Sequence, residues 1–297
     1  MSPEKEPHFF NTDDRRLVTT VDKYADLFRG ADDCHVALGE ASVWYLSSSD
    51  AVQNILRYQP EAKFIVMLRS PLEMAPALHA EMVLSGHENV SNFASAWEMQ
   101  ADRRGGTCLP ALCWANRRLL YGDICSLGVQ LQRLRMLVSS HRVLTVLLDD
   151  VIESPRREYL RVLRFLGVSD DGRAEFPIFN KARIARWPLL TRLLFVFTEL
   201  KGRTGINLHL RLSSRLSAAN IIEGRRPILS PDTRGKLQAY FASDVALLGR
   251  LLNRDLGHWL GLTPESANLA RGTRRKFRST VFRGSSDPSE DMIITGN

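Results

Sequence analysis

The sequence lacks the cysteine patterns that build metal centres and disulfide frameworks. Only four of its 297 residues are cysteines, and they form neither a Cys-x-x-Cys pair nor a cluster with histidines at metal-ligand spacing: Cys34, Cys108, Cys113 and Cys125. We therefore expect no metal site. Reduced structural thiols in a cytoplasmic protein are the simplest interpretation of this pattern.

An N-terminal signal of basic and then apolar residues is also absent, and so is a long hydrophobic run. The longest apolar stretch, PLLTRLLFVFTEL at 188–200, carries Arg192 and falls short of the roughly 20 residues that a membrane span needs. No transmembrane segment is expected. The stretch predicts a core or docking helix, and a helix lying on a membrane surface is the alternative.

Acidic residues are in the minority, since 40 lysines and arginines stand against 33 aspartates and glutamates. The resulting net charge of +7 favours anionic partners, which include nucleotides, phosphorylated or sulfated ligands, nucleic acid and a membrane face. With 44% hydrophobic residues and no internal repeat, the chain can bury one large core. We expect one main domain with appendages.

Two continuous apolar runs predict strands buried on both faces, as in a parallel sheet. The first covers residues 64–68 and ends at Arg69; the second covers 143–148 and leads into two aspartates. Helical patterns precede and follow each run, and the helix after the second run begins at Ser154-Pro155 and closes at Gly167. This alternation predicts an α/β fold with a parallel sheet flanked by helices.

The C-terminal third of the sequence shows helical patterns without predicted strands. Residues 181–262 predict only helices, the last of them capped by Ser230 and Pro231. Beyond 262 the composition changes to Gly, Ser, Arg and Thr. We therefore expect an α/β domain over 1–262 and a disordered basic and polar tail over 263–297.

Arg69 and Ser70 mark the first candidate site. An arginine directly after a buried strand lies at the carboxyl edge of a parallel sheet, where open α/β folds bind ligands. Ser70 begins the following helix, whose N-terminus attracts anions. A phosphate would fit there, although an arginine that pairs with a surface carboxylate explains the position equally well.

The order of these segments resembles a known family. AKFIVMLRSPLEMA, preceded by LGEASVWYLSSSDAVQNILRYQPE and followed by VLTVLLDDVIESPRREYLRVLRFLGV, is similar to sulfotransferases that use 3′-phosphoadenosine 5′-phosphosulfate (PAPS). It resembles especially the bacterial branch that is similar to the heparan sulfate enzymes, and the resemblance runs from about residue 3 to about residue 262. It implies a P-loop-like fold in which Arg69 contacts the 3′-phosphate of PAPS, and we expect Ser70, at the start of the following helix, to support that contact. The family pattern R-N-P-x-x-R-x-x-S is broken here, because Met74 and Ala77 replace its second arginine and its serine.

The resemblance also assigns a role to KEPHFF at residues 5–10. Heparan-type enzymes carry a K-E-x-x-F-F segment whose glutamate is the catalytic base, and the matching residue is Glu6. A positioned carboxylate can take the proton of an acceptor hydroxyl as the hydroxyl attacks sulfur. Lys5 is a candidate for offsetting charge on the leaving phosphate, or else a solvated neighbour. His8 is an alternative base, although a lone histidine beside two phenylalanines is more often a packing residue.

Two further matches are weak. GEASVWY at 39–45 stands where heparan-type relatives read G-E-K-T-P-x-Y, and it suggests a minor substrate-facing role for Trp44 and Tyr45. KGRTG at 201–205 is similar to a phosphate loop of other sulfotransferases, but an ordinary loop between helices is the favoured interpretation.

The resemblance further implies a first strand and a loop of the type K-x-G-T-T/S that wraps the 5′-phosphosulfate, and neither is found upstream of Glu6. We expect that the start codon is placed too late by about 30 to 40 residues, the length of one strand-loop-helix unit. A decayed gene and a binding protein that lost catalysis are the alternatives. The chain as given is expected to be poorly soluble or inactive, because its sheet would lack a strand that is usually central.

Together these features predict a sulfotransferase that uses PAPS as co-substrate and no metal. Its acceptor would be a hydroxyl, or an amine, on a small molecule or a glycan that is carbohydrate-like or lipid-linked. No specific nucleic-acid partner is expected, and the sequence leaves the oligomeric state open. The alternatives are an inert sulfotransferase-like remnant and a basic protein that binds anions or nucleic acid through RGTRRKFRSTVFR at 271–283.

Overall fold

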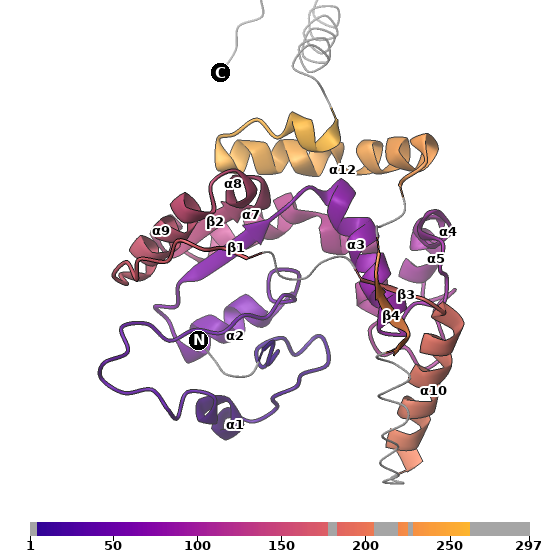
Figure 1. Ribbon diagram of the computed structural model, residues 1–297, viewed down its shortest axis with the longest axis horizontal. Helices are drawn as coiled ribbons and strands as arrows, with labels where there is room; N and C mark the ends of the chain where they lie inside the picture. The colour runs from indigo at the N-terminus through magenta and orange to yellow at the C-terminus, as the bar shows by residue number, and fades with distance from the viewer. Residues whose placement is uncertain (1–4, 178–182, 205–218, 225–227, 262–297) are drawn as a thin grey trace, which may run out of the picture.

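Helices surround a short parallel sheet in this protein (Figure 1). The structure, a computed structural model, describes residues 5–177, 183–204, 219–224 and 228–261. The strands are β1 (Phe64–Leu68), β2 (Val143–Leu147), β3 (Arg183–Ala185) and β4 (Ile221–Glu223). The α-helices are α1 (Val21–Asp26), α2 (Ala51–Tyr58), α3 (Pro71–Leu84), α4 (Phe93–Glu98), α5 (Gln100–Arg104), α6 (Tyr121–Cys125), α7 (Leu127–Leu137), α8 (Leu148–Glu153), α9 (Pro155–Leu166), α10 (Pro188–Thr204) and α12 (Pro231–Leu252), and the short 3-10 helices are η1 (Asn116–Leu119), η2 (Ser140–Arg142) and η3 (Gly257–Leu260). The predicted tail at 263–297 lies outside the described residues.

The two predicted strands pair in parallel. Phe64 lies opposite Val143 at one end of the β1–β2 pair, and Leu68 lies opposite Leu147 at the other. This pairing and the flanking helices confirm the predicted α/β fold. The expected burial on both faces is wrong, however, because Ile65 and Met67 of β1 are 38% and 59% exposed. Side chains alternate across a strand, and in β1 only the face that carries Val66 and Leu68 is buried. On the opposite face the neighbour of Met67 in β2, Val146, is 1% exposed, so that face is covered over β2 but not over β1.

The covered face of the sheet belongs to one continuous core. Val66 and Leu68 pack with Leu72 of α3, Leu131 of α7 and Leu237 of α12, all of them less than a tenth exposed. Burying a leucine side chain stabilises a fold by about 1.5–3 kcal/mol. This core therefore joins the sheet to the C-terminal helix across more than 160 residues of chain.

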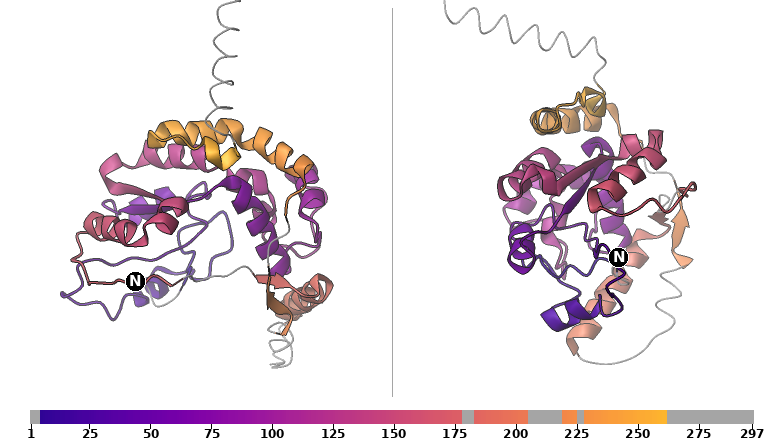
Figure 2. Two further views of the ribbon diagram at one scale, coloured as in Figure 1. Left: turned by 45° about the horizontal axis from the view of Figure 1, so that its top comes forward. Right: turned by 90° about the vertical axis from the view of Figure 1, so that its left-hand side faces the viewer.

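The longest helix, α12, packs along α7 (Figures 1 and 2). As predicted, it begins at Ser230 and Pro231, and the Ser230 hydroxyl accepts a hydrogen bond from the Thr233 N–H at 3.2 Å. Asp244 in its middle is buried and accepts hydrogen bonds from Gly128 N–H at 2.8 Å and Val129 N–H at 2.9 Å. These donors are the free N–H groups of the first turn of α7, so the Asp244 carboxylate acts as its cap.

The C-terminal third is mainly helical, as expected, but it also contains a short pair of strands. Arg183 of β3 lies opposite Glu223 of β4 in an antiparallel pair that local sequence patterns did not reveal. α10 follows β3 and continues to Thr204, so residues 201–204 of the KGRTG segment are helical. The loop interpretation of those four residues is therefore wrong, and Gly205 lies outside the described residues.

A buried charged network holds the helices between the two main strands. Arg103 of α5 donates two hydrogen bonds to the Glu88 carboxylate, at 2.7 and 2.9 Å, and the side chains of both residues are fully buried. The Tyr121 hydroxyl of α6 also donates to Glu88, at 2.6 Å. Burial alone would raise the pKa of Glu88, but these donors outweigh it and hold the pKa below its usual value.

Replacing Glu88 with Gln should lower the free energy of unfolding by about 3 kcal/mol or more, because Arg103 is left buried without a counter-charge. Chemical denaturation at neutral pH measures this change. In the wild type, the contribution of Glu88 to the free energy of unfolding should be complete above its ordinary pKa of 4.5. It should be lost as the pH falls through the lower pKa that Glu88 has in the folded protein. The matched control is Asp26→Asn, which breaks the exposed pair with Arg29 and should cost less than about 1 kcal/mol. Equal losses in the two variants would contradict a stabilising role for the buried network.

Candidate functional site

The KEPHFF segment lies against residues 40–45. Along it, Glu6 N–H donates to the carbonyl oxygen of Ala41 at 3.2 Å, and His8 N–H donates to the Ser42 hydroxyl at 3.2 Å. Two residues further, Phe10 N–H donates to the Tyr45 hydroxyl at 3.3 Å. The structure therefore joins two segments that sequence analysis had selected separately.

Aromatic packing holds this segment in place. Phe9 and Phe10 are buried, and the Phe9 ring stacks on Tyr24 of α1 with a centroid distance of 4.6 Å. Phe10 meets Tyr24 edge-on at 4.9 Å and Tyr58 of α2 at 5.6 Å. Aromatic contacts of this geometry each add about 0.5–1.5 kcal/mol to the effect of burial. The two phenylalanines therefore anchor the segment next to Glu6.

Glu6 and His8 form a pair. His8 Nε2 lies 3.4 Å from Glu6 Oε2, and both residues have a positive φ, 58° and 50°, which non-glycine residues rarely adopt. The interaction with His8 lowers the pKa of Glu6 against the raising effect of burial, and the charges of Lys5 and Arg118 lower that pKa further. Glu6 is therefore ionised at neutral pH. Lys5 itself is exposed, so its effect on Glu6 acts through solvent.

His8 is largely enclosed, which fits part of its expected packing role. It is 6% exposed, and its Nδ1 atom is buried without a hydrogen-bond partner. Its Nε2 atom nevertheless faces the Glu6 carboxylate. His8 thus packs beside the phenylalanines and also orients Glu6.

A second carboxylate, Glu40, lies in the same cluster. It accepts hydrogen bonds from the Ser42 hydroxyl at 2.8 Å and the Tyr45 hydroxyl at 2.6 Å. Burial raises the pKa of Glu40 above its usual value despite these two donors. Glu6 and Glu40 are therefore shifted in opposite directions, which is the arrangement that separates a base from an acid at an active site. Sequence analysis noted Glu40 only as part of a weak motif.

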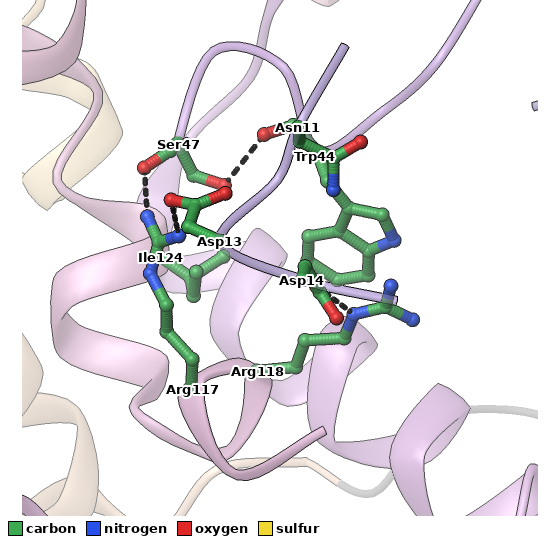
Figure 3. A pocket seen from close by; sticks show the side chains of 8 residues that line it. All are labelled: Asn11, Asp13, Asp14, Trp44, Ser47, Arg117, Arg118 and Ile124. Atoms are coloured by element: carbon green, nitrogen blue, oxygen red, sulfur yellow. Dashed lines mark hydrogen bonds and ion pairs between the residues drawn. The ribbon is translucent and has the colours of Figure 1, made fainter. Parts of the chain in front are cut away.

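A small pocket, too tight to hold a water molecule, has Asn11, the residue directly after this segment, in its lining (Figure 3). Arg117 and Arg118 extend from η1; Arg117 binds Asp13, and Arg118 Nε donates to Asp14 at 2.7 Å. The Arg118 guanidinium also lies over the Trp44 ring, 4.3 Å from its centroid. Trp44 and Tyr45, the two residues with an expected substrate-facing role, are thus both engaged in contacts within the protein.

Asn11 lines the same pocket and is the polar residue that sequence analysis missed. It is completely buried, yet neither atom of its side-chain amide has a hydrogen-bond partner. A buried amide without protein partners costs stability, and an ordered water, a bound ion or a functional role can each account for such a group. No local pattern in the sequence distinguishes this asparagine from a surface one.

Arg69 and Ser70 lie elsewhere, at the carboxyl edge of β1. Arg69 Nη2 donates to Glu73 one helical turn further at 3.2 Å, while its Nε atom is buried without a partner. The Ser70 hydroxyl donates to the carbonyl oxygen of Trp259 at 3.2 Å. Within the described residues, neither Arg69 nor Ser70 shares a hydrogen bond or ion pair with Glu6.

The segment at 254–260 closes this edge of the sheet. Arg254 donates two hydrogen bonds to Asp150, at 2.5 and 2.7 Å, and Trp259 Nε1 donates to Asp149 at 2.5 Å. His258 Nε2 lies 3.0 Å from the same Asp149 carboxylate. Arg254 thus compensates the charge of Asp150, and both carboxylates that follow β2 are engaged in hydrogen bonds rather than left free. No group of three or more His, Cys, Asp or Glu residues that could hold a metal occurs in the described part of the chain.

Comparison with known proteins identifies the fold. No family model matches the sequence, and no curated protein matches it. The structure is similar to the crystal structure of a sulfotransferase from Alicyclobacillus acidocaldarius, with a TM-score of 0.60, 23% sequence identity and 87% of each chain covered. The parallel sheet, its flanking helices and the helical C-terminal part therefore form a sulfotransferase-like, P-loop-like fold.

Exchanging Asn11 for Leu should raise the free energy of unfolding by about 1–2 kcal/mol, because a side chain of similar volume removes two unpartnered polar groups from the interior. Thermal and chemical denaturation measure the change. Asn54→Leu is the matched control, since the Asn54 amide donates to the carbonyl oxygen of Phe10 at 2.8 Å and its loss should destabilise by about 1 kcal/mol. A destabilised Asn11→Leu variant would show that this amide has a structural role.

Proposed function

We propose that this protein transfers a sulfuryl group from PAPS to a hydroxyl, or to an amine, of a carbohydrate-like or lipid-linked acceptor. The observation that carries the proposal is the fold, which matches a solved sulfotransferase over 87% of both chains. The KEPHFF segment adds a specific chemical argument, because it holds an ionised carboxylate beside a histidine.

In the proposed reaction, Glu6 is the general base. The acceptor oxygen attacks sulfur, a new S–O bond forms, and the S–O bond to the 5′-phosphate breaks with its electron pair remaining on the phosphate. The acceptor proton moves to the Glu6 carboxylate, and adenosine 3′,5′-bisphosphate leaves. The lowered pKa of Glu6 keeps it in the proton-accepting form at neutral pH, and His8 orients it.

Arg69 is proposed to hold the 3′-phosphate. Its Nε atom is buried without a partner, and its position at the carboxyl edge of a parallel sheet beside a helix N-terminus suits an anion. The Ser70 hydroxyl donates its proton to the Trp259 carbonyl oxygen. To donate to a phosphate instead, the hydroxyl must first give up this hydrogen bond. Met74 and Ala77 on α3 provide no polar group, and we expect weaker donor binding than in relatives with the full pattern.

The remaining assignments follow the same reasoning. Lys5, which is exposed beside Glu6, is proposed to offset charge on the leaving phosphate. Transfer needs no metal under this proposal. All four cysteines are free thiols, which supports a reducing, cytoplasmic location.

The first test concerns the base. Glu6→Gln should lower the turnover number by about 10²- to 10⁴-fold, because the amide cannot accept the acceptor proton. Transfer of labelled sulfuryl from PAPS to a panel of sugars and polyols measures the turnover number of the chain of 297 residues. Glu61→Gln, at an 83% exposed side chain, is the matched control and should leave turnover unchanged. Equal rates for Glu6→Gln and the wild type would exclude Glu6 as the base.

The second test concerns the donor. Arg69→Ala should weaken binding of adenosine 3′,5′-bisphosphate at least about tenfold, since a charge-assisted hydrogen bond contributes about 1.5–3 kcal/mol. Calorimetric titration measures the affinity. Adenosine 5′-phosphate lacks the 3′-phosphate, so its affinity should be the same for the variant and the wild type. Arg29→Ala, at a side chain that is 79% exposed, should not change either affinity. An Arg69→Ala variant that loses both nucleotides equally would contradict the specific contact with the 3′-phosphate.

A further inference from the structure

One face of α10 is apolar and exposed. Four side chains on it are between 48% and 72% exposed: Leu189, Leu193, Phe197 and Leu200. Their spacing of four, four and three residues places them in one line along the helix, which we call the α10 stripe. Monomeric proteins rarely leave a continuous apolar surface of this kind uncovered unless it binds something.

The other side of α10 is fixed to the body of the protein. Arg192 donates to the carbonyl oxygens of Gly86, at 2.7 Å, and Ala111. Phe195 meets His87 edge-on at 4.7 Å and fits so closely against Gly86 that a Cβ there would lie 2.5 Å from it. These contacts set the rotation of the helix and turn the stripe away from the core. Figures 1 and 2 show α10 at the edge of the molecule, where a flat surface can reach it.

The sequence around the stripe carries mostly positive charge. From 183 to 204 it contains one acidic residue, Glu199, and five basic ones. Of these, Arg192 faces the body of the protein, whereas Arg183 and Arg186 precede the helix. Glu199 lies 3.6 Å from Arg15 and is therefore already compensated. Just before the helix, Trp187 is 52% exposed, and the Arg186 guanidinium lies over its ring at 4.7 Å.

We infer that the α10 stripe docks on an anionic lipid surface. The helix would lie in the plane of the interface, with its leucines and Phe197 among the acyl chains and Trp187 and Arg186 at the level of the headgroups. None of the helices in the described part of the chain is long and apolar enough to cross a membrane, so docking is peripheral. The excess of positive charge complements anionic lipid, whereas a second copy on the same face would bring like charges together.

This inference is independent of the proposed function, and its structural consequence concerns the site. Arg15 directly follows Asp14, which lines the pocket, and it pairs with Glu199 on α10. Arg15 also lies over the Trp114 ring at 4.9 Å, and Arg118 of the pocket lies over the same ring at 5.0 Å. A docked α10 would therefore hold the pocket near the lipid surface.

Co-sedimentation with vesicles tests the inference. The wild-type chain should bind vesicles of equimolar phosphatidylglycerol and phosphatidylcholine and should not bind vesicles of phosphatidylcholine alone. The double variant Leu193→Glu, Phe197→Glu should reduce binding at least about tenfold, because it removes two buried apolar contacts and adds negative charge. Raised salt should weaken wild-type binding, since it screens the attraction to the lipid.

A matched double variant tests whether the loss of vesicle binding comes from the stripe itself or from any added negative charge. Met136→Glu, Ile152→Glu also replaces two exposed apolar residues, 74% and 73% exposed, on α7 and α8, and it should keep most of the binding. Circular dichroism and melting temperature should be unchanged in both double variants. Absence of vesicle binding by the wild type, or equal losses in the two double variants, would overturn the inference. So would a wild-type dimer in analytical ultracentrifugation that the stripe variant dissociates, because the stripe would then be a self-interface.

Discussion

The attachment of the segment at 254–260 to the carboxyl edge of the sheet is the interaction on which the rest of the arrangement depends. Arg254 and Asp150 form a two-bond ion pair, and the Ser70 hydroxyl binds the Trp259 carbonyl next to it. These contacts connect residues more than 100 positions apart. They fix the end of α12 over the point where β1 and β2 finish, and they leave Arg69 beside a helix N-terminus, with Asp149 and Asp150 both engaged in hydrogen bonds.

A second constraint positions the chemistry. The KEPHFF segment has no regular secondary structure, yet buried aromatic rings and three backbone donors hold it against residues 40–45. The result is a pair of carboxylates in different environments, Glu6 with a lowered pKa and Glu40 with a raised one. The positive φ angles of Glu6 and His8 show that local backbone preference yields to these tertiary contacts.

Much of the fold was predictable because it follows from local periodicity. The apolar runs at 64–68 and 143–148 specified two strands and their parallel pairing, and Ser230-Pro231 specified the start of α12. The β3–β4 pair was not predictable, since each strand is three residues long and gains its identity only from the other. Residues 201–204 also differ from expectation. They include Gly202 and Thr204, which disfavour a helix, yet they form the last turn of α10, whose preceding residues have a helical apolar pattern.

For the candidate site, the resemblance of KEPHFF to a family motif selected Glu6, and the place after a buried strand selected Arg69 and Ser70. The surroundings of these residues were not predictable. Asn11 is distinguished by a buried amide without hydrogen-bond partners, and Glu40 by a pKa that burial raises despite two hydrogen-bond donors. Burial depends on how the whole chain packs. The sequence by itself determined the strands, the capped helices, the positive charge and the chemically capable side chains, because each depends on residues within a few positions of one another. Only the tertiary structure decided which face of β1 is covered, which side of α10 faces outward and which carboxylates share a cluster, because these depend on contacts between segments far apart in the chain.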